Sequence, residues 1–277
     1  MVEEEKKKKQ IGSGLEMYFN HNVAKKFAEL EQNEKNFRVA DIVDKIIMQE
    51  MTGIKGPIYA AELGGGAHPD RYDRFFAKLL QKPNGHLDWV DISPYMLDLA
   101  KQYLDDDKYR NRWEVITFIE DDILNYLNGL EDEVLDLAIM KYTFDHIENV
   151  SFLFELLSKK LKDGGKMIAT ITTLSPELKS ISTNARFLYQ GEEFPENETR
   201  KLEDGERFRI KFFKQSGNPE AGYMEEAETE KFFHSKEKIV KLAKQLGFDY
   251  YLGDWKGLAN KNEHVDQIIL VLTKNRK

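Results

Sequence analysis

The stretch that decides the fold is Glu62-Leu63-Gly64-Gly65-Gly66-Ala67-His68-Pro69. A short apolar run over residues 57–61 precedes it and predicts a buried strand, and residues 70–80 carry apolar side chains at helical spacing. The glycines therefore lie on a strand-to-helix turn, where the missing Cβ allows a tight turn and a close approach of a ligand to the backbone. The N–H groups of the following helix favour an anionic group, and Pro69 suits its first turn. Such a turn is typical of nucleotide-like cofactor sites in open α/β sheets.

A second strand is predicted over residues 86–91, and it ends in a carboxylate, Asp91. Asp91 follows Gly64 by roughly 27 residues, near the spacing at which an acidic residue meets a ribose in these folds. The two oxygens of a carboxylate can accept hydrogen bonds from two ribose hydroxyls. The alternative is that Asp91 only caps the helix expected to begin near Ser93 and Pro94.

The turn itself indicates the kind of nucleotide. A dinucleotide-binding turn requires glycine or alanine at its sixth position, and counting from Gly64 this position is Pro69. The Gly-Lys-Ser/Thr sequence of nucleotide triphosphatases does not follow the glycines. A cofactor that has a ribose but no pyrophosphate fits better.

With these residues in place, the chain resembles the class I S-adenosylmethionine-dependent methyltransferases, over roughly residues 40–175 and at its C-terminal end. Residues 62–66 look like the acidic-x-Gly-x-Gly motif of the family, and residues 91–97 are similar to the second motif, whose acid binds the ribose. Residues 118–123 resemble the third motif, in which an Asp receives the adenine amine. Residues 135–140 and 161–168 resemble the fourth strand and the entry to the fifth. Each motif is degenerate alone, and together in this order they are specific.

The resemblance implies S-adenosylmethionine as the cofactor and assigns roles to single residues. Glu62 would pair with the cationic amino-acid end of the cofactor. Asp122 is preferred over Asp121 for the adenine amine, because an apolar residue, Ile123, follows it and can cover the adenine. The alternative is that this acidic run is a solvated turn. His68 stands where the family has its third glycine.

The full set of expected cofactor contacts combines the motifs, the loop after the fourth strand and the N-terminal helices. In the family, such an N-terminal segment covers the cleft, which makes Tyr18 and Phe19 candidates for lid contacts; the alternative is that both only pack on the sheet. The expected cofactor-binding residues are Glu62, Gly64, Gly65, Gly66, Asp91, Ile92, Met96, Asp122, Ile123, Lys141 and Tyr18.

Composition limits the other function classes. The chain has 277 residues, of which 41% are hydrophobic and 12% aromatic, so it can bury one large core, or one core with a substantial insertion. It contains no cysteine, which excludes disulfides, cysteine zinc sites and thiol nucleophiles. The net charge of −8 disfavours a nucleic-acid surface. We find no apolar run of membrane-spanning length and no secretory signal, and so expect a cytoplasmic protein without membrane partners.

The predicted fold class is α/β: a Rossmann-like, doubly wound, mostly parallel sheet with an antiparallel last strand. Residues 1–14, with their lysine run, are predicted to be a disordered tail. Residues 15–277 form a single methyltransferase domain, in which residues 15–53 are a helical cap. Strand and helix patterns alternate from residue 57 to 174, with the fifth strand over residues 166–171.

Residues 175–233 break this alternation and predict a β-containing insertion on the substrate side. Residues 207–213 alternate with period two and predict a strand, with a possible partner over residues 223–233. The helix that follows is predicted to start after an N-cap at Ser235 and to end at Gly247. Residues 248–251 and 267–272 are the expected final strands.

Methyl transfer from a sulfonium is an in-line displacement that requires the acceptor and the methyl group to be held in line and water to be excluded. The loop over residues 141–146 should face the ligand edge of the sheet. Tyr142 and His146 are the candidate catalytic residues, and Asp145 is a further acceptor contact. The alternative is that His146 is a structural residue at the start of the next helix. No convincing metal cluster is found in the sequence.

The expected acceptor is a small molecule, with aromatic residues of the insertion as a possible pocket wall. The same residues could instead only seal the insertion onto the domain. The other functional hypotheses are methylation of a protein or RNA, and a non-catalytic protein that binds S-adenosylmethionine for regulation. The aromatic residues in question are Phe187, Tyr189, Phe194, Phe208, Phe212, Phe213, Tyr223, Phe232 and Phe233.

Overall fold

The computed structural model describes residues 21–31, 34–52, 54, 56–182, 185–215, 218–254 and 268–276. The predictions made for the tail and for Tyr18 and Phe19 lie outside the described residues. Within those ranges, no helix has the length and apolar character needed to cross a membrane.

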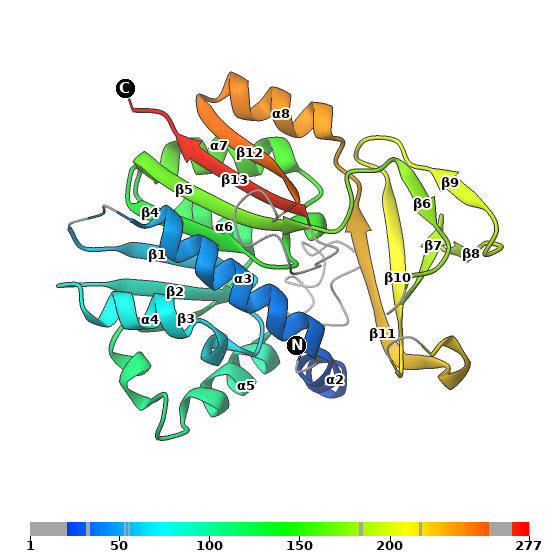
Figure 1. The fold of residues 1–277 in the computed structure, drawn as a ribbon, viewed down its shortest axis with the longest axis horizontal. Coiled ribbons are helices and arrows are strands. Elements are labelled where there is room, and N and C mark those ends of the chain that lie inside the picture. Colours follow the sequence, from blue (N-terminus) through cyan, green and yellow to red (C-terminus); the bar gives the residue numbers. More distant parts are fainter. Residues whose placement is uncertain are drawn as a thin grey trace, which may run out of the picture.

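A seven-stranded sheet forms the centre of the chain (Figure 1). Its strand order is β12-β13-β5-β4-β1-β2-β3. All neighbouring pairs from β5 to β3 are parallel, whereas β13 runs antiparallel to both β5 and β12. The mostly parallel sheet with an antiparallel last strand is therefore confirmed. The strands are β1 (Tyr59–Leu63), β2 (His86–Asp91), β3 (Ile116–Glu120), β4 (Leu135–Met140), β5 (Leu161–Ile171), β12 (Phe248–Asp254) and β13 (Ile268–Lys274).

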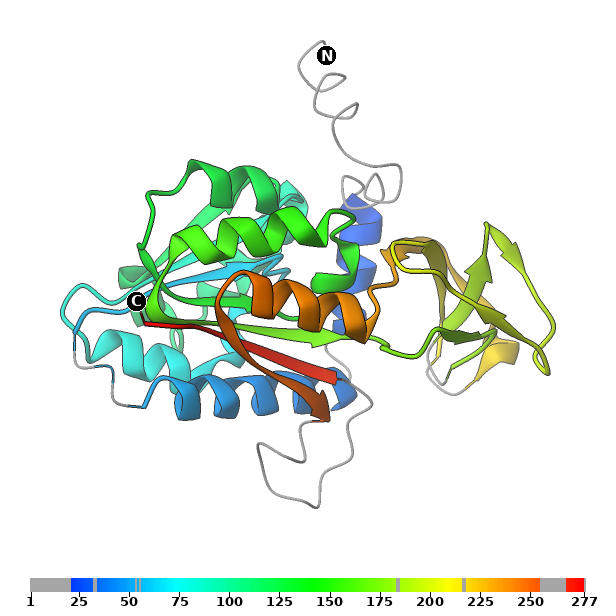
Figure 2. The same ribbon diagram turned by 90° about the horizontal axis from the view of Figure 1, so that it is seen from above.

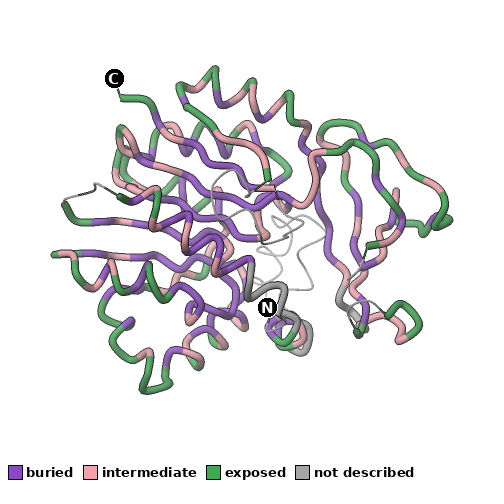
Figure 3. Tube along the Cα trace, in the orientation of Figure 1, coloured by how far each residue is buried: buried purple, intermediate pink, exposed green. Residues whose placement is uncertain are grey.

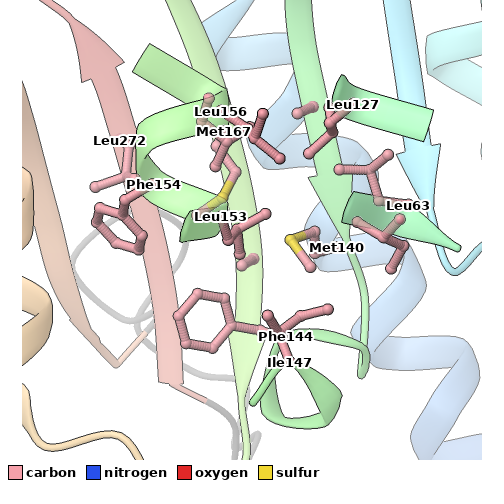
Figure 4. Close-up of a cluster of buried hydrophobic side chains, with 14 of the residues drawn as sticks. Leu63, Leu127, Met140, Phe144, Ile147, Leu153, Phe154, Leu156, Met167 and Leu272 are labelled. Atoms are coloured by element: carbon pink, nitrogen blue, oxygen red, sulfur yellow. The ribbon is translucent and has the colours of Figure 1, made fainter. Parts of the chain in front are cut away.

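Helices cover both faces of this sheet because successive strand residues point to opposite sides. One buried cluster takes in Ala60 of β1 and residues of α3 (Glu34–Glu50), α4 (Asp73–Leu80) and α5 (Pro94–Leu104). The other takes in Ala61 and residues of α6 (Ile123–Gly129), α7 (Val150–Lys160) and α8 (Lys236–Gln245). Figure 2 shows α3 and α8 on opposite sides of the sheet, and Figure 4 shows the second cluster closing between α7, β4 and β13.

Two local predictions need correction. The helix expected over residues 70–80 is split into a 3-10 turn, η2 (Pro69–Arg71), and α4, because Tyr72 between them has the non-helical angles φ −102 and ψ 52. Pro69 does occupy the first position of the 3-10 turn. The fifth strand starts earlier than expected, at Leu161, with a register shift in its pairing with β4 and a positive φ at Gly164.

The insertion is a small β unit beside the carboxyl ends of the main strands (Figure 1). It has a four-stranded sheet in the order β11-β10-β7-β8 and a two-stranded sheet of β6 and β9. The predicted strand at residues 207–213 is present with those bounds and pairs antiparallel with the partner proposed for it. The strands are β6 (Glu177–Lys179), β7 (Ala185–Tyr189), β8 (Glu192–Glu193), β9 (Thr199–Lys201), β10 (Arg207–Phe213) and β11 (Tyr223–Phe232).

The insertion has its own small core, and this core shows which of its aromatic residues pack inside the insertion and do not line a pocket. Phe194, Phe208 and Phe233 are buried in that core, so these three rings seal the insertion. Burial along the chain is greatest in the main strands and α3, whereas β8 is exposed (Figure 3). The N-cap predicted at Ser235 is confirmed, since its side chain accepts a hydrogen bond from the N–H of Lys238.

Candidate functional site

The glycine turn folds back over the end of the neighbouring strand. The N–H groups of Gly64 and Gly65 both donate to the carbonyl oxygen of Val90, at 2.8 and 2.9 Å. Because β1 and β2 are parallel neighbours, this places the turn at their common carboxyl ends. This is the edge at which open α/β sheets bind ligands.

Asp91 connects that turn to the next helix. One carboxylate oxygen accepts from the N–H of Gly66 at 2.8 Å, and the other accepts from the N–H of Ser93 at 2.8 Å. The N-cap of α5 is Ser93, whose side chain accepts from the N–H of Met96, so Asp91 does not serve as the cap. A carboxylate oxygen can accept two hydrogen bonds. The backbone contacts of Asp91 are therefore compatible with the predicted ribose function, and they orient its two oxygens.

The glycines are required by their protein neighbours as well as by the turn. A Cβ on Gly64 would lie 2.4 Å from the side chain of Thr143, and one on Gly65 would lie 2.3 Å from the ring of Trp89. Gly66 has φ +64, and its carbonyl oxygen accepts from the indole N–H of Trp89 at 2.9 Å. The turn packs between β2 and the loop after β4, and only glycine leaves room for these two neighbours. The local sequence did not reveal this requirement.

A buried acid and a buried base both lie close to Tyr72. Glu62 is fully buried at the end of β1 and accepts a hydrogen bond from the Tyr72 hydroxyl at 3.3 Å. Lys141 is also buried, directly after β4, with its Nζ 5.6 Å from the centre of the Tyr72 ring. The structure thus brings both predicted cofactor residues to the same end of the sheet, β1 and β4 being neighbours.

The third motif serves a local purpose in the structure. Asp122 is the N-cap of α6, with one oxygen accepting from the N–H groups of Leu124 and Asn125 at 2.8 and 3.2 Å. Asp121 accepts from the N–H of Asp122 at 2.8 Å, and Ile123 is buried in the core. These contacts tie both aspartates to the start of α6, and the adenine contact stays a prediction.

Two other expected cofactor contacts lie on the strand-to-helix segment after β2. Ile92 is half-buried. Met96 is buried against Ala67 of the glycine turn, in a cluster that also includes Ala28 of the helix α2 (His21–Glu31). Tyr18 lies outside the described residues.

The loop after β4 carries the two candidate catalytic residues. Tyr142 is half-buried and has φ +63, a backbone conformation that is strained for a bulky side chain, and its N–H donates to the hydroxyl of Thr170 at 2.7 Å. His146 lies in the 3-10 turn η4 (Phe144–His146), ahead of α7 rather than at its first residue. Its Nδ1 donates to the carbonyl oxygen of Glu230 at 2.8 Å. Burial and the charge of Lys231 lower the pKa of His146 to about 3.

Asp145 is engaged by the insertion and by the end of β5. It accepts from the N–H of Thr172 at 2.9 Å and from Nζ of Lys231 at 3.3 Å, and all the side-chain atoms involved are largely buried. Sequence reasoning missed Lys231, which lies in a polar, largely acidic stretch without any sign that it would be buried. Its burial depends on how the insertion docks on the sheet, which is a long-range property.

Known proteins resemble the chain at the level of sequence. A family model described as a methyltransferase domain matches residues 73–169, from α4 into β5. Malonyl-[acyl-carrier protein] O-methyltransferase 1 of Ilyobacter polytropus is 33% identical over 119 residues, which are 38% of this chain and 41% of that protein. The similarity thus spans less than half of the length of the curated relative.

Solved structures resemble it at the level of the fold. An S-adenosylmethionine-dependent methyltransferase from Clostridium acetobutylicum superposes with a TM-score of 0.55 at 17% identity, covering 91% of this chain and 99% of that one. The CcbJ methyltransferase of Streptomyces caelestis superposes with a TM-score of 0.57 at 12% identity, covering 86% and 90%. These structures confirm the expected fold, and together with the family model they confirm the resemblance to class I S-adenosylmethionine-dependent methyltransferases.

Proposed function

We propose that this chain binds S-adenosylmethionine and transfers its methyl group to a small acceptor molecule. The observation that carries the proposal is the geometry of Asp91, whose two oxygens are oriented by the N–H groups of Gly66 and Ser93 at the carboxyl end of β2. A buried carboxylate held in this way is suited to accept from two neighbouring hydroxyls. The matching family model lends the methyltransferase assignment its independent support.

The buried charges around Tyr72 suit the amino-acid end of the cofactor. That end carries an ammonium and a carboxylate, and Glu62 and Lys141 offer one partner of each sign. Asp122 and Ile123 are proposed to contact the adenine, at the carboxyl end of the next strand, β3. Ile92 and Met96 would complete the apolar lining between them.

The chemistry requires little from the protein beyond position. When bound, S-adenosylmethionine supplies a sulfonium methyl group that an acceptor lone pair can attack as the carbon–sulfur bond breaks. The chain orients the acceptor and excludes water from it. Tyr142 is proposed to contact the acceptor, since strained backbone of this kind gathers at functional sites.

The state of His146 bears on which acceptor is suitable. With a pKa of about 3 it is a weak base at neutral pH, and its Nδ1 proton is committed to the Glu230 carbonyl. We therefore propose an acceptor that already has an available lone pair near neutral pH, such as a carboxylate. In this mechanism His146 does not serve as a general base, and its hydrogen bond to Glu230 helps to position the insertion.

A second candidate acceptor is an acyl group attached to a carrier protein. The similarity to a malonyl-[acyl-carrier protein] O-methyltransferase favours it, and a carboxylate at the end of such an acyl group fits the argument from His146. In this case the insertion would face the carrier protein, not only a small molecule.

Calorimetric titration with S-adenosylmethionine and, separately, with NAD tests the cofactor. We expect micromolar binding of S-adenosylmethionine and none of NAD. Binding of NAD alone, or of neither, would contradict the proposal. Release of S-adenosylhomocysteine is then followed by mass spectrometry with free dicarboxylic acids and with a malonyl-loaded carrier protein. Turnover of the free acids supports the first acceptor, and turnover of only the loaded carrier protein supports the second.

A further inference from the structure

His68 connects the glycine turn to the N-terminal helix. Its Nε2 lies 3.0 Å from the carbonyl oxygen of Ala28 on α2, and its Nδ1 lies 3.2 Å from a carboxylate oxygen of Asp70 on η2. The side chain is 3% exposed, and its ring lies against that of Tyr103 on α5, with the ring centres 4.4 Å apart. Three elements around the candidate cofactor site thus meet at this one imidazole.

The two partners determine the proton count of the ring. A backbone carbonyl only accepts hydrogen bonds, and so does an ionised carboxylate. Both ring nitrogens must therefore donate, which only the imidazolium form can do. Asp70 is the ionised partner: although its burial raises the pKa of its carboxyl, the hydrogen bond and charge of His68 and the charge of Arg71 together bring that pKa below 3.8.

The helix that His68 contacts packs on two segments of the predicted cofactor site. Ala24 and Ala28 of α2 pack with Ala67 of the glycine turn and Met96 of α5 in one buried cluster. In both ribbon views α2 stands between the main sheet and the insertion (Figures 1 and 2). That residues 15–53 form a helical cap stays a prediction.

We propose that His68 is a positioning residue whose imidazolium fastens α2 to the glycine turn, so that the helix covering the cofactor site is held by a proton. When His68 loses that proton, one ring nitrogen becomes an acceptor facing another acceptor, and the contact with Ala28 or with Asp70 must weaken. The effect on cofactor affinity rests on the proposed function, but the effect on α2 does not.

The ionisable groups near His68 come from the three elements that meet at its ring. Asp70 and Arg71 on η2 face it, and the phenol of Tyr103 lies on its ring from α5. On α2, Lys25 and Glu29 are exposed, as is His21, whose ring meets Tyr95 of α5 edge-on. His21 is a histidine of α2 itself that does not contact Ala28 or Asp70 in this way, and it therefore serves as the control.

Hydrogen exchange of the ligand-free protein tests the proposal. Protection factors for residues 21–31, which divide out the chemical effect of pH on exchange, are compared at about pH 6 and about pH 8. In the wild type we expect them to fall by about fivefold to tenfold on raising the pH, the difference between a charged and a neutral hydrogen bond. In His68→Gln, which keeps one donor but no charge, they should not change with pH, and in His21→Gln they should fall as in the wild type.

Two outcomes would overturn the proposal: protection that is independent of pH in the wild type, or the same dependence in His68→Gln. If that variant does not fold, Asp70→Asn provides the second test, since it removes the carboxylate at a partly exposed position and should also abolish the fall between pH 6 and 8. Titration with S-adenosylmethionine at the two pH values then tests the functional consequence. Absence of binding at both would contradict the proposed function and leave the result for α2 standing.

Discussion

Replacing Asp91 with alanine tests the candidate cofactor site through the residue on which it depends most. Asp91 is 8% exposed, and its carboxylate accepts from the N–H groups of Gly66 and Ser93. Its loss leaves two largely buried donors without acceptors, which should lower the free energy of unfolding by about 2–4 kcal/mol. Its loss also removes the hydrogen bonds proposed to the ribose, each of the charge-assisted kind. We expect affinity for S-adenosylmethionine to fall by about 1.5–3 kcal/mol, or roughly 10- to 150-fold.

Calorimetry gives the affinity and urea titration gives the stability of the same protein. A folded Asp91→Ala protein that binds as tightly as the wild type would refute the ribose assignment. If alanine prevents folding, Asp91→Asn keeps the volume and one acceptor, and we expect about a tenfold loss of affinity.

Asp88 offers a matched control on the same strand. It lies three residues before Asp91, so its side chain points to the other face of the sheet. There it accepts from the hydroxyls of Tyr59 and Tyr126, both at 2.6 Å, and contacts His86. Asp88→Asn should lower stability by about 1–3 kcal/mol and leave cofactor affinity unchanged. A loss of affinity in this control would mean that any buried carboxylate of β2 affects binding through stability alone.

Three further predictions concern other parts of the structure. Gly65→Ala places a methyl group 2.3 Å from the indole of Trp89, so we expect a lower melting temperature and at least tenfold weaker cofactor binding by calorimetry. Gly129→Ala is the control: no atom lies within 4 Å of its new Cβ, and neither quantity should change. Lys231→Met leaves Asp145 buried without its cation and should cost about 3–5 kcal/mol in urea unfolding, while adding Asp145→Asn should recover part of that loss. Burial acts to raise the pKa of Asp88, but the hydrogen bonds that its carboxylate accepts bring this pKa below 3.8. The ionised carboxylate therefore stabilises the fold above that pH, and the stabilisation is lost as the pH falls through the lower pKa of the folded protein. In urea unfolding, the wild type should lose more stability than Asp88→Asn on acidification below about pH 4.

The parts of the fold that depend on local signals could be predicted from the sequence. Residues 86–91 and 207–213 form strands with the expected bounds. For residues 207–213 the signal was the period-two alternation of apolar and polar side chains, which reports which face of a strand is buried. Ser235 caps its helix, because a hydroxyl at that position satisfies the first N–H groups whatever else the chain does. The alternation of strand and helix patterns over residues 57–174 also indicated the parallel sheet.

The parts that depend on contacts distant in sequence could not be predicted. Tyr72 leaves the helical conformation and points its hydroxyl to Glu62, which is why the helix begins three residues later than its periodicity indicates. Gly65 packs on Trp89, two residues that no local pattern pairs. Lys231 is buried because the insertion folds back on the loop after β4. In each case the contact decides the conformation, and the contact is a property of the assembled fold.

Strand β11 attaches the insertion to both halves of the candidate site. On one side, the carbonyl of Glu230 and the ammonium of Lys231 bind the loop that carries His146 and Asp145. On the other, Met224 packs on the cluster that joins α2 to the glycine turn and α5. A ligand that displaced this strand to reach the loop after β4 would therefore disturb the support of α2. Since coupling between two sites is reciprocal, a cofactor that stabilises α2 would in turn restrain β11 and the acceptor side of the site.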